Sequence, residues 1–134
     1  MWICPKCGRP FKREGQTHSC RLFPLEKHFA GKPRGAALYE KFKLETKKRV
    51  GDFIVDSPEC CIHFVHTSTF VAVEIFKEKI RVEFVLNHSI ESGRISKFVQ
   101  MSANRYLYYL DLKTEEDIDD ELMAWVREAH DLKK

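Results

Sequence analysis

Alternating apolar and polar positions in the middle of the chain predict a β-sheet. Between Lys79 and Leu86 every second residue is a large apolar one, and charged residues lie between them. The two residues Lys77-Glu78 separate this segment from an equally apolar one, so the pair predicts a hairpin with a short turn. Connections of this length join only antiparallel strands. We therefore expect an antiparallel sheet of about five strands, drawn from the segments 53–55, 60–65, 69–76, 79–86, 98–101 and 106–112.

Helical spacing of apolar residues marks both ends of this strand-rich region. One helix is predicted from Pro33 to about Arg49, with Gly51 as its stop. A second helix is predicted after Thr114, which forms a capping-box pattern with Asp117. Its apolar stripe contains Ile118, Leu122, Trp125, Val126 and Ala129. The fold class is therefore α+β, with an N-terminal and a C-terminal helix flanking the sheet.

The first twenty-one residues differ in composition from the rest and have too few aliphatic side chains to form a core. They contain Cys4-Pro-Lys-Cys7-Gly8, a tight turn that directs two sulfurs to one point. Ten residues later, His18 and Cys20 lie two positions apart, so an extended segment places both on one side. Three sulfurs and one nitrogen form a closed tetrahedral set that suits one structural Zn²⁺ ion and leaves no position for a catalytic water. We expect a zinc knuckle at 1–21, a connector at 22–35 and an α+β domain at 36–134.

Three alternatives to this ligand set stay open. Cys4 and Cys7 form a redox pair in the first, although such pairs normally open a helix in a βαβ unit. In the second, His28 replaces His18 as the fourth ligand. In the third, no metal binds. Clustered cysteines in an odd number favour metal binding in a reducing compartment over a disulfide framework, so a cytoplasmic location is expected.

Overall composition is that of a soluble globular protein, with 43% hydrophobic and 32% charged residues among 134. No apolar run approaches the roughly 20 residues of a membrane span, so no membrane association is expected. The net charge of +3 conceals an asymmetry, because residues 1–50 carry +9 and residues 51–134 carry −6. A basic N-terminal part predicts a polyanionic partner, either DNA or RNA or an acidic protein. The predicted nucleic-acid contacts on the knuckle are Lys6, Arg9, Lys12, Arg13 and Arg21, and the basic run continues through Lys27, Lys32 and Arg34.

A second group of possible ligands lies at Cys60, Cys61, His63 and His66. Strand alternation places the two adjacent cysteines on opposite faces, so only Cys61 and His63 are expected to lie together. We interpret these residues as core or surface positions. No phosphate loop, nucleophile elbow or dinucleotide fingerprint occurs, and no catalytic residue is predicted. A non-enzymatic nucleic-acid-binding module is the favoured hypothesis, with a protein-interaction or small-ligand module as the alternative.

The N-terminal segment resembles a zinc-binding tag, with the pattern CxxC…HxC, found on small bacterial proteins. The remainder, including His28-Phe-Ala-Gly-Lys-Pro33 and the ending from Leu112 to His130, resembles a bacterial family of domains of unknown function, number 5655. This resemblance implies a compact α+β domain, stand-alone or attached to other domains, and implies no established activity. Relatives often carry histidine in the strand where this chain has Tyr108-Tyr109.

Overall fold

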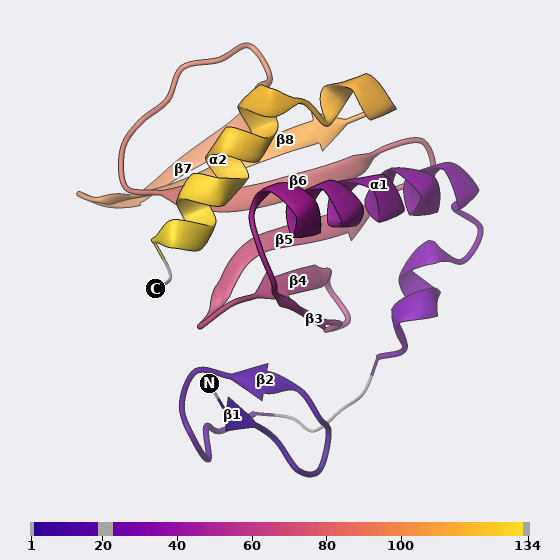
Figure 1. Cartoon of the computed structure of the whole chain (residues 1–134), viewed down its shortest axis with the longest axis vertical. Coiled ribbons are helices and arrows are strands. Elements are labelled where there is room, and N and C mark those ends of the chain that lie inside the picture. Colours follow the sequence, from indigo (N-terminus) through magenta and orange to yellow (C-terminus); the bar gives the residue numbers. More distant parts are fainter. Residues whose placement is uncertain (1, 19–22, 133–134) are drawn as a thin grey trace.

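The computed structural model describes residues 2–18 and 23–132 and contains one six-stranded antiparallel sheet (Figure 1). Its strand order is β3-β4-β5-β6-β8-β7, so the connection from β6 to β7 passes over β8 and the last two strands form a hairpin. The strands span β3 Ile54–Asp56, β4 Ile62–Val65, β5 Thr69–Ile75, β6 Ile80–Leu86, β7 Ile95–Ser102 and β8 Arg105–Leu112. The predicted α+β class is confirmed, with six strands in the main sheet in place of about five.

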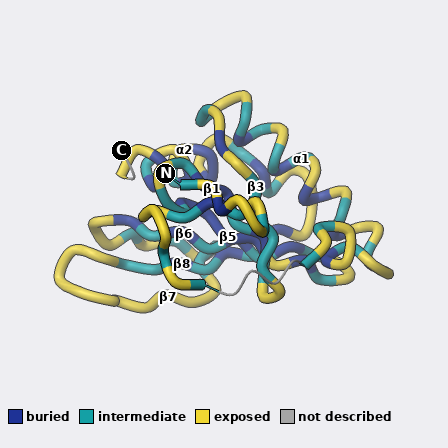
Figure 2. The backbone as a smooth tube through the Cα atoms, turned by 90° about the horizontal axis from the view of Figure 1, so that it is seen from below, coloured by how far each residue is buried: buried dark blue, intermediate teal, exposed yellow. Residues whose placement is uncertain are grey.

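Two α-helices cover one face of this sheet. Helix α1 spans Pro33–Arg49, as the periodicity predicts, and α2 spans Asp120–Asp131. Both contact β5 and β6 as well as each other (Figure 1). An apolar core lies between the helices and the sheet, and Phe64 is fully buried in it. The ring of Phe64 lies near the rings of Tyr39, Phe42, Phe53 and Phe70. Figure 2 shows buried positions in the strands and along the inner sides of the helices.

The C-terminal helix begins later than the sequence pattern suggests. The capping box of Thr114 and Asp117 is formed, but it opens a short 3-10 turn at Glu115–Asp117. Helix α2 begins only after Asp119, whose carboxylate accepts a hydrogen bond from the backbone N–H of Leu122. Arg94 donates to the same carboxylate at 2.8 Å, so a residue from the β6–β7 connection helps to fix the start of α2.

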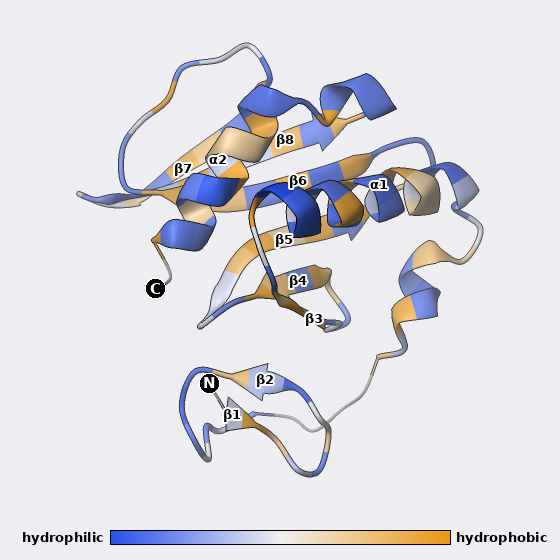
Figure 3. Ribbon diagram, viewed as in Figure 1, coloured by the Kyte–Doolittle hydropathy of each residue, from blue (hydrophilic) through white to orange (hydrophobic). Residues whose placement is uncertain are grey.

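Within residues 2–18 and 23–132, no helix covers the other face of the sheet. Strand register places a polar row across this face, in which His63, Ala72, Glu83, Tyr109 and Lys97 are successive neighbours. Tyr108, one residue away, points into the core and is 1% exposed. On the helix side of the sheet, Figure 3 shows apolar positions in β5 and β6 and hydrophilic positions along α1.

The N-terminal residues form a separate two-stranded sheet beside the β3–β4 edge (Figure 1). Its strands are β1 Trp2–Ile3 and β2 Pro10–Phe11, and the 3-10 helix η1, Leu25–Phe29, leads from this region toward α1. We call residues 2–18 the knuckle and residues 33–132 the body. Within the described part of the chain, no helix is both long and apolar enough to cross a bilayer.

Candidate metal centre

Cys4 and Cys7 lie on a turn closed at both ends by backbone hydrogen bonds. The N–H of Gly8 donates to the carbonyl of Cys4 at 2.8 Å, and the N–H of Cys4 donates to the carbonyl of Arg9 at 3.0 Å. Gly8 has a φ of +73°, a left-handed conformation that strains any residue with a Cβ. The glycine after the second cysteine is therefore what lets the chain reverse and direct both sulfurs to one side.

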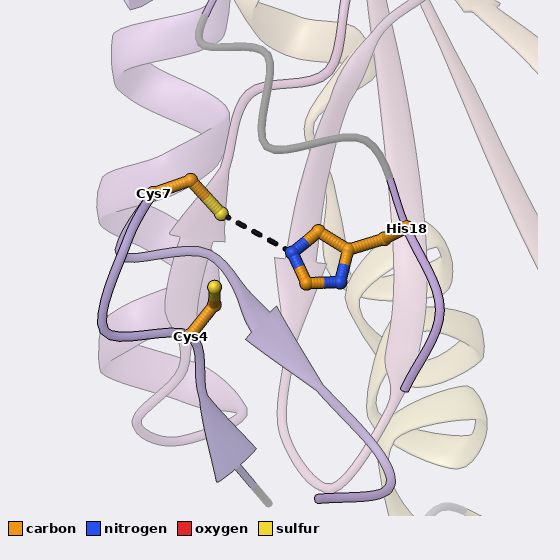
Figure 4. Close-up of side chains that lie close together, drawn as sticks. All are labelled: Cys4, Cys7 and His18. Carbon is orange, nitrogen blue, oxygen red and sulfur yellow. Dashed lines mark hydrogen bonds between the residues drawn. The ribbon is translucent and has the colours of Figure 1, made fainter. Parts of the chain in front are cut away.

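His18 completes a cluster with these two cysteines (Figure 4). The three potential ligand atoms lie within 4.8 Å of one another, and Cys7 Sγ lies 3.5 Å from His18 Nε2. A sulfur and a nitrogen bound to one tetrahedral zinc ion lie about 3.5 Å apart, given the usual bond lengths. The backbone carbonyl oxygen of Gln16 lies 2.7 Å from Nδ1 of His18. In the tautomer with the proton on Nδ1, this oxygen accepts a hydrogen bond from Nδ1–H, and Nε2 is free to bind a metal. The separation and the tautomer both fit a zinc ligand.

The protonation of Cys4 also suits metal binding. The pKa of the Cys4 thiol is lowered to about 6, chiefly by a hydrogen bond from the Cys7 backbone. Burial of Cys4 opposes this effect, while the Lys6 backbone and the side chains of Cys7 and His18 add to it. Because only the thiolate binds zinc, a thiol with this pKa is largely ready for a metal ion at neutral pH.

Aromatic rings enclose the histidine. Phe11 stacks on His18 with ring centroids 3.9 Å apart, and Trp2 meets the same ring edge-on at 6.0 Å. Trp2 and Phe11 belong to the paired strands β1 and β2, where they are direct cross-strand neighbours. These two rings pack around the candidate ligand and fix its orientation.

The structure separates the two histidines that the sequence offers as fourth ligand. His28 is buried against the body, where its Nε2 lies 3.0 Å from the hydroxyl of Ser57 and its ring packs on Phe23. His28 is not among the residues that cluster with Cys4 and Cys7. The predicted ligand Cys20 and the predicted nucleic-acid contact Arg21 lie outside the described residues.

The basic residues of the knuckle fall into two groups. Arg9 donates from Nε to Oδ1 of Asp56 at 3.0 Å, and this ion pair joins β2 to β3 of the body. Its pKa is raised chiefly by this hydrogen bond, against the opposing effect of its own burial. Lys6, Lys12 and Arg13 are exposed, and no described carboxylate forms an ion pair with them. Asp56 is the site residue that sequence reasoning missed, because nothing local marks it as the partner of a residue 47 positions away.

Two cations of the connector have internal partners. Lys32 donates to the carbonyl of Ile75, and Arg34 donates to the carbonyl of Lys113. Both bonds tie the start of α1 to the strands. Lys6, Lys12 and Arg13 of the knuckle are therefore better placed for an external partner than Lys32 and Arg34.

A hollow of about 230 Å³ lies between the knuckle and the sheet. On the knuckle side it is lined by Arg9, Phe11 and Lys12, and on the body side by residues that include Ser68 and Thr69. Cationic and hydroxyl side chains thus line one space together with Asp56, whose carboxylate is paired with Arg9. These are donor types that bind phosphate and sugar oxygens.

The second group of cysteines differs from the sequence prediction. Cys60 and Cys61 were expected on opposite strand faces, but β4 begins only at Ile62 and the two cysteines lie in the preceding bend. Strand alternation therefore does not apply to Cys60. Its Sγ lies 2.6 Å from Sγ of Cys61, and Sγ of Cys61 lies 3.1 Å from Nε2 of His63. Cys60, Cys61 and His63 thus form a second cluster, while His66 stacks on His130 instead.

The sequence profile of one family, Domain of unknown function (DUF5655), matches residues 25–133. The match covers most of the chain and the whole α+β body, so the chain belongs to this family. It begins after the knuckle, and the candidate metal centre therefore lies ahead of the family domain. Comparison with curated proteins and with solved structures gives no significant match.

Proposed function

We propose that this protein is a non-enzymatic nucleic-acid-binding module whose knuckle is held together by one structural zinc ion. The observation that carries the proposal is the set of three exposed cations, Lys6, Lys12 and Arg13, around the candidate metal site. Their positions on a segment with little apolar core make their spacing dependent on the metal. In this proposal zinc binding and nucleic-acid binding are therefore linked.

The zinc ion has a structural role in this proposal. Cys4, Cys7 and His18 supply three ligands, and Cys20 is the proposed fourth. Such a closed set excludes water from the metal, so the ion supplies folding free energy and no catalytic step.

The Arg9–Asp56 ion pair supports this proposal by fixing the knuckle on the body. With the knuckle docked, Lys12 lines the same hollow as the hydroxyls of Ser68 and Thr69. We propose that the hollow takes a phosphate and its sugar, while Lys6 and Arg13 contact neighbouring phosphates. Contacts of this kind bind the backbone and give little sequence preference.

Fluorescence anisotropy with labelled single-stranded RNA and DNA at low salt tests the proposal. We expect micromolar or tighter binding by the parent and a large loss in the triple variant Lys6→Ala/Lys12→Ala/Arg13→Ala. The slope of log Kd against log salt concentration should fall by about 2 in that variant, since each single-strand phosphate contact contributes about 0.7.

A charge-matched control separates specific contacts from net charge. The variant Lys77→Ala/Arg105→Ala/Arg127→Ala also removes three exposed cations, all of them on the body. It should bind nearly as well as the parent. Equal losses in both triple variants, or no binding by the parent at micromolar protein, would contradict the proposed interface. Binding of an acidic protein in place of nucleic acid would instead favour the protein-interaction alternative, which the +9 and −6 charge split also suits.

A further inference from the structure

The cluster of Cys60, Cys61 and His63 has the composition of a metal site. Its three ligand atoms lie within 4.8 Å of one another, as do those of Cys4, Cys7 and His18 in the knuckle. Two cysteine sulfurs and an imidazole favour soft and borderline ions such as Zn²⁺ over Mg²⁺ or Ca²⁺. Burial raises the pKa of the Cys61 thiol, so metal binding here must displace its proton. The residues come from the bend before β4 and from β4 itself, so this cluster belongs to the body and not to the knuckle.

The surroundings of His63 orient it toward the sulfurs. Its Nε2 lies 3.1 Å from Cys61 Sγ, while the hydroxyl of Thr69 lies 3.5 Å from Nδ1 on the other side of the ring. Metal-binding histidines commonly have such a polar partner on the second ring nitrogen. Thr69 belongs to β5, the strand paired with β4, so the ring is held between two neighbouring strands.

The side chain of Cys60 can move to the position that metal binding would require. Two thiolates on one tetrahedral zinc ion lie about 3.8 Å apart. The sulfurs of Cys60 and Cys61 are 2.6 Å apart, so one of them must move outward by about 1 Å. Cys60 is exposed and lies outside the strand, and a rotation of its side chain disturbs no core contact.

The cluster borders a surface hollow of about 350 Å³ on the face of the sheet opposite the helices. Cys60 and Cys61 form one side of the hollow, and Glu83 and Tyr109 of the polar row form another. Ala72 lies between His63 and Glu83 in that row, and its small side chain leaves the space open. Two of the three candidate ligands therefore border open space, while His63 lines the hollow between the knuckle and the sheet.

We propose that Cys60, Cys61 and His63 bind a second thiophilic divalent cation, separate from the zinc of the knuckle. Its fourth coordination position is open to a water molecule or a small exogenous ligand. Three protein ligands with one open position distinguish this site from the closed four-ligand set of the knuckle.

Metal content and cobalt spectroscopy of the fully reduced whole chain test this proposal. We expect two equivalents of zinc in the parent and one in each of the variants Cys60→Ser and His63→Ala. The reciprocal variant Cys4→Ser/Cys7→Ser should lose the zinc of the knuckle and keep the zinc bound by Cys60, Cys61 and His63. On titration with Co²⁺, that reciprocal variant should still show a thiolate-to-cobalt charge-transfer band, and the band should disappear when Cys60→Ser is added.

Two controls make the result decisive. His88→Ala removes an exposed histidine that belongs to neither cluster and should keep both equivalents. Circular dichroism of Cys60→Ser should match that of the parent, because Cys60 is exposed. Zinc bound by the folded parent in an amount that neither Cys60→Ser nor His63→Ala lowers would overturn the proposal, whether or not the knuckle binds zinc.

Discussion

Arg9 and Asp56 form the ion pair that fixes the knuckle to the family domain. Nε of Arg9 lies 3.0 Å from Oδ1 of Asp56, and NH2 lies 3.4 Å from Oδ2, so the guanidinium contacts both carboxylate oxygens. Asp56 is 6% exposed and is the direct cross-strand neighbour of His63. The pair therefore lies between the two cysteine clusters, and Coulombic interactions with Cys7 and Cys60 make smaller contributions to the raised pKa of Arg9.

Replacement of Arg9 should destabilise the docked state. In Arg9→Ala the carboxylate of Asp56 stays buried without its cation, a change that costs about 3–5 kcal/mol for a fully buried pair. Because the Arg9 side chain is 21% exposed, we expect a smaller loss, about 1–3 kcal/mol. Urea denaturation measures it, and Arg13→Ala, which removes an exposed arginine of the same knuckle, should change stability by less than about 0.5 kcal/mol.

A double-mutant cycle isolates the Arg9–Asp56 interaction. The destabilisation by Arg9→Ala should shrink markedly in the Asp56→Asn background, because no buried charge is then left unpaired. Independent, additive effects of the two substitutions would show that the ion pair does not hold the knuckle in place.

Gly35 determines how closely α1 approaches the end of β5. A Cβ at this position would overlap the backbone carbonyl oxygen of Phe76 and lie 2.8 Å from Cγ2 of Ile75. Backbone atoms cannot yield easily, so Gly35→Ala should destabilise the body by about 1–3 kcal/mol. Gly93→Ala is the matched control, because a Cβ there meets no atom within 4 Å. Thermal denaturation of both variants checks the difference, and equal midpoints would show that α1 does not pack as tightly as described.

The ion pairs of Asp111 should make the free energy of unfolding depend on pH. Burial alone would raise its pKa, but hydrogen bonds and ion pairs with Arg81 and Lys79, at 2.9 and 3.0 Å, lower it overall. A lowered carboxyl pKa stabilises the fold above the unfolded value of about 3.9 and loses this effect as the pH falls through the folded value. The deficit of Asp111→Asn relative to the parent should therefore be constant from about pH 5 to 7 and shrink below about pH 4.

Denaturant titrations at a series of pH values measure that deficit. Asp52→Asn, which removes an exposed carboxylate outside any described ion pair, is the control and should show little change with pH. A deficit for Asp111→Asn that stayed constant down to pH 3 would contradict the lowered pKa.

Local pattern was sufficient to predict most of the fold. The helical period from Pro33 to Arg49 and the strict alternation from Ile80 to Leu86 each follow from one buried face, and the structure confirms both. The start of α2 could not be predicted in the same way. Thr114 and Asp117 form their capping box, but the helix begins only where Arg94, a residue from a distant connection, secures Asp119.

In the candidate sites too, features set by residues close in sequence could be predicted, whereas contacts between residues far apart in sequence could not. The spacing of Cys4, Cys7 and His18 predicted a cluster, and these three residues do lie together, although the binding of zinc stays a prediction. Cys61 and His63 lie together as predicted, but the prediction wrongly separated Cys60 from them, because strand alternation does not apply to the two residues that precede β4. The docking role of Arg9 depends on a partner 47 residues away, which no local pattern reveals.

The most direct test of the metal-organised knuckle is the zinc content of the untagged whole chain beside His18→Ala and His28→Ala. Nε2 of His18 lies 3.5 Å from Sγ of Cys7, whereas Nε2 of His28 is hydrogen-bonded to the hydroxyl of Ser57 in the body. We predict that His18→Ala binds one zinc ion fewer per chain than the parent and that His28→Ala binds as many as the parent. Loss of zinc with His28→Ala and not with His18→Ala, or equal zinc in all three proteins, would contradict the assignment of His18 as a ligand.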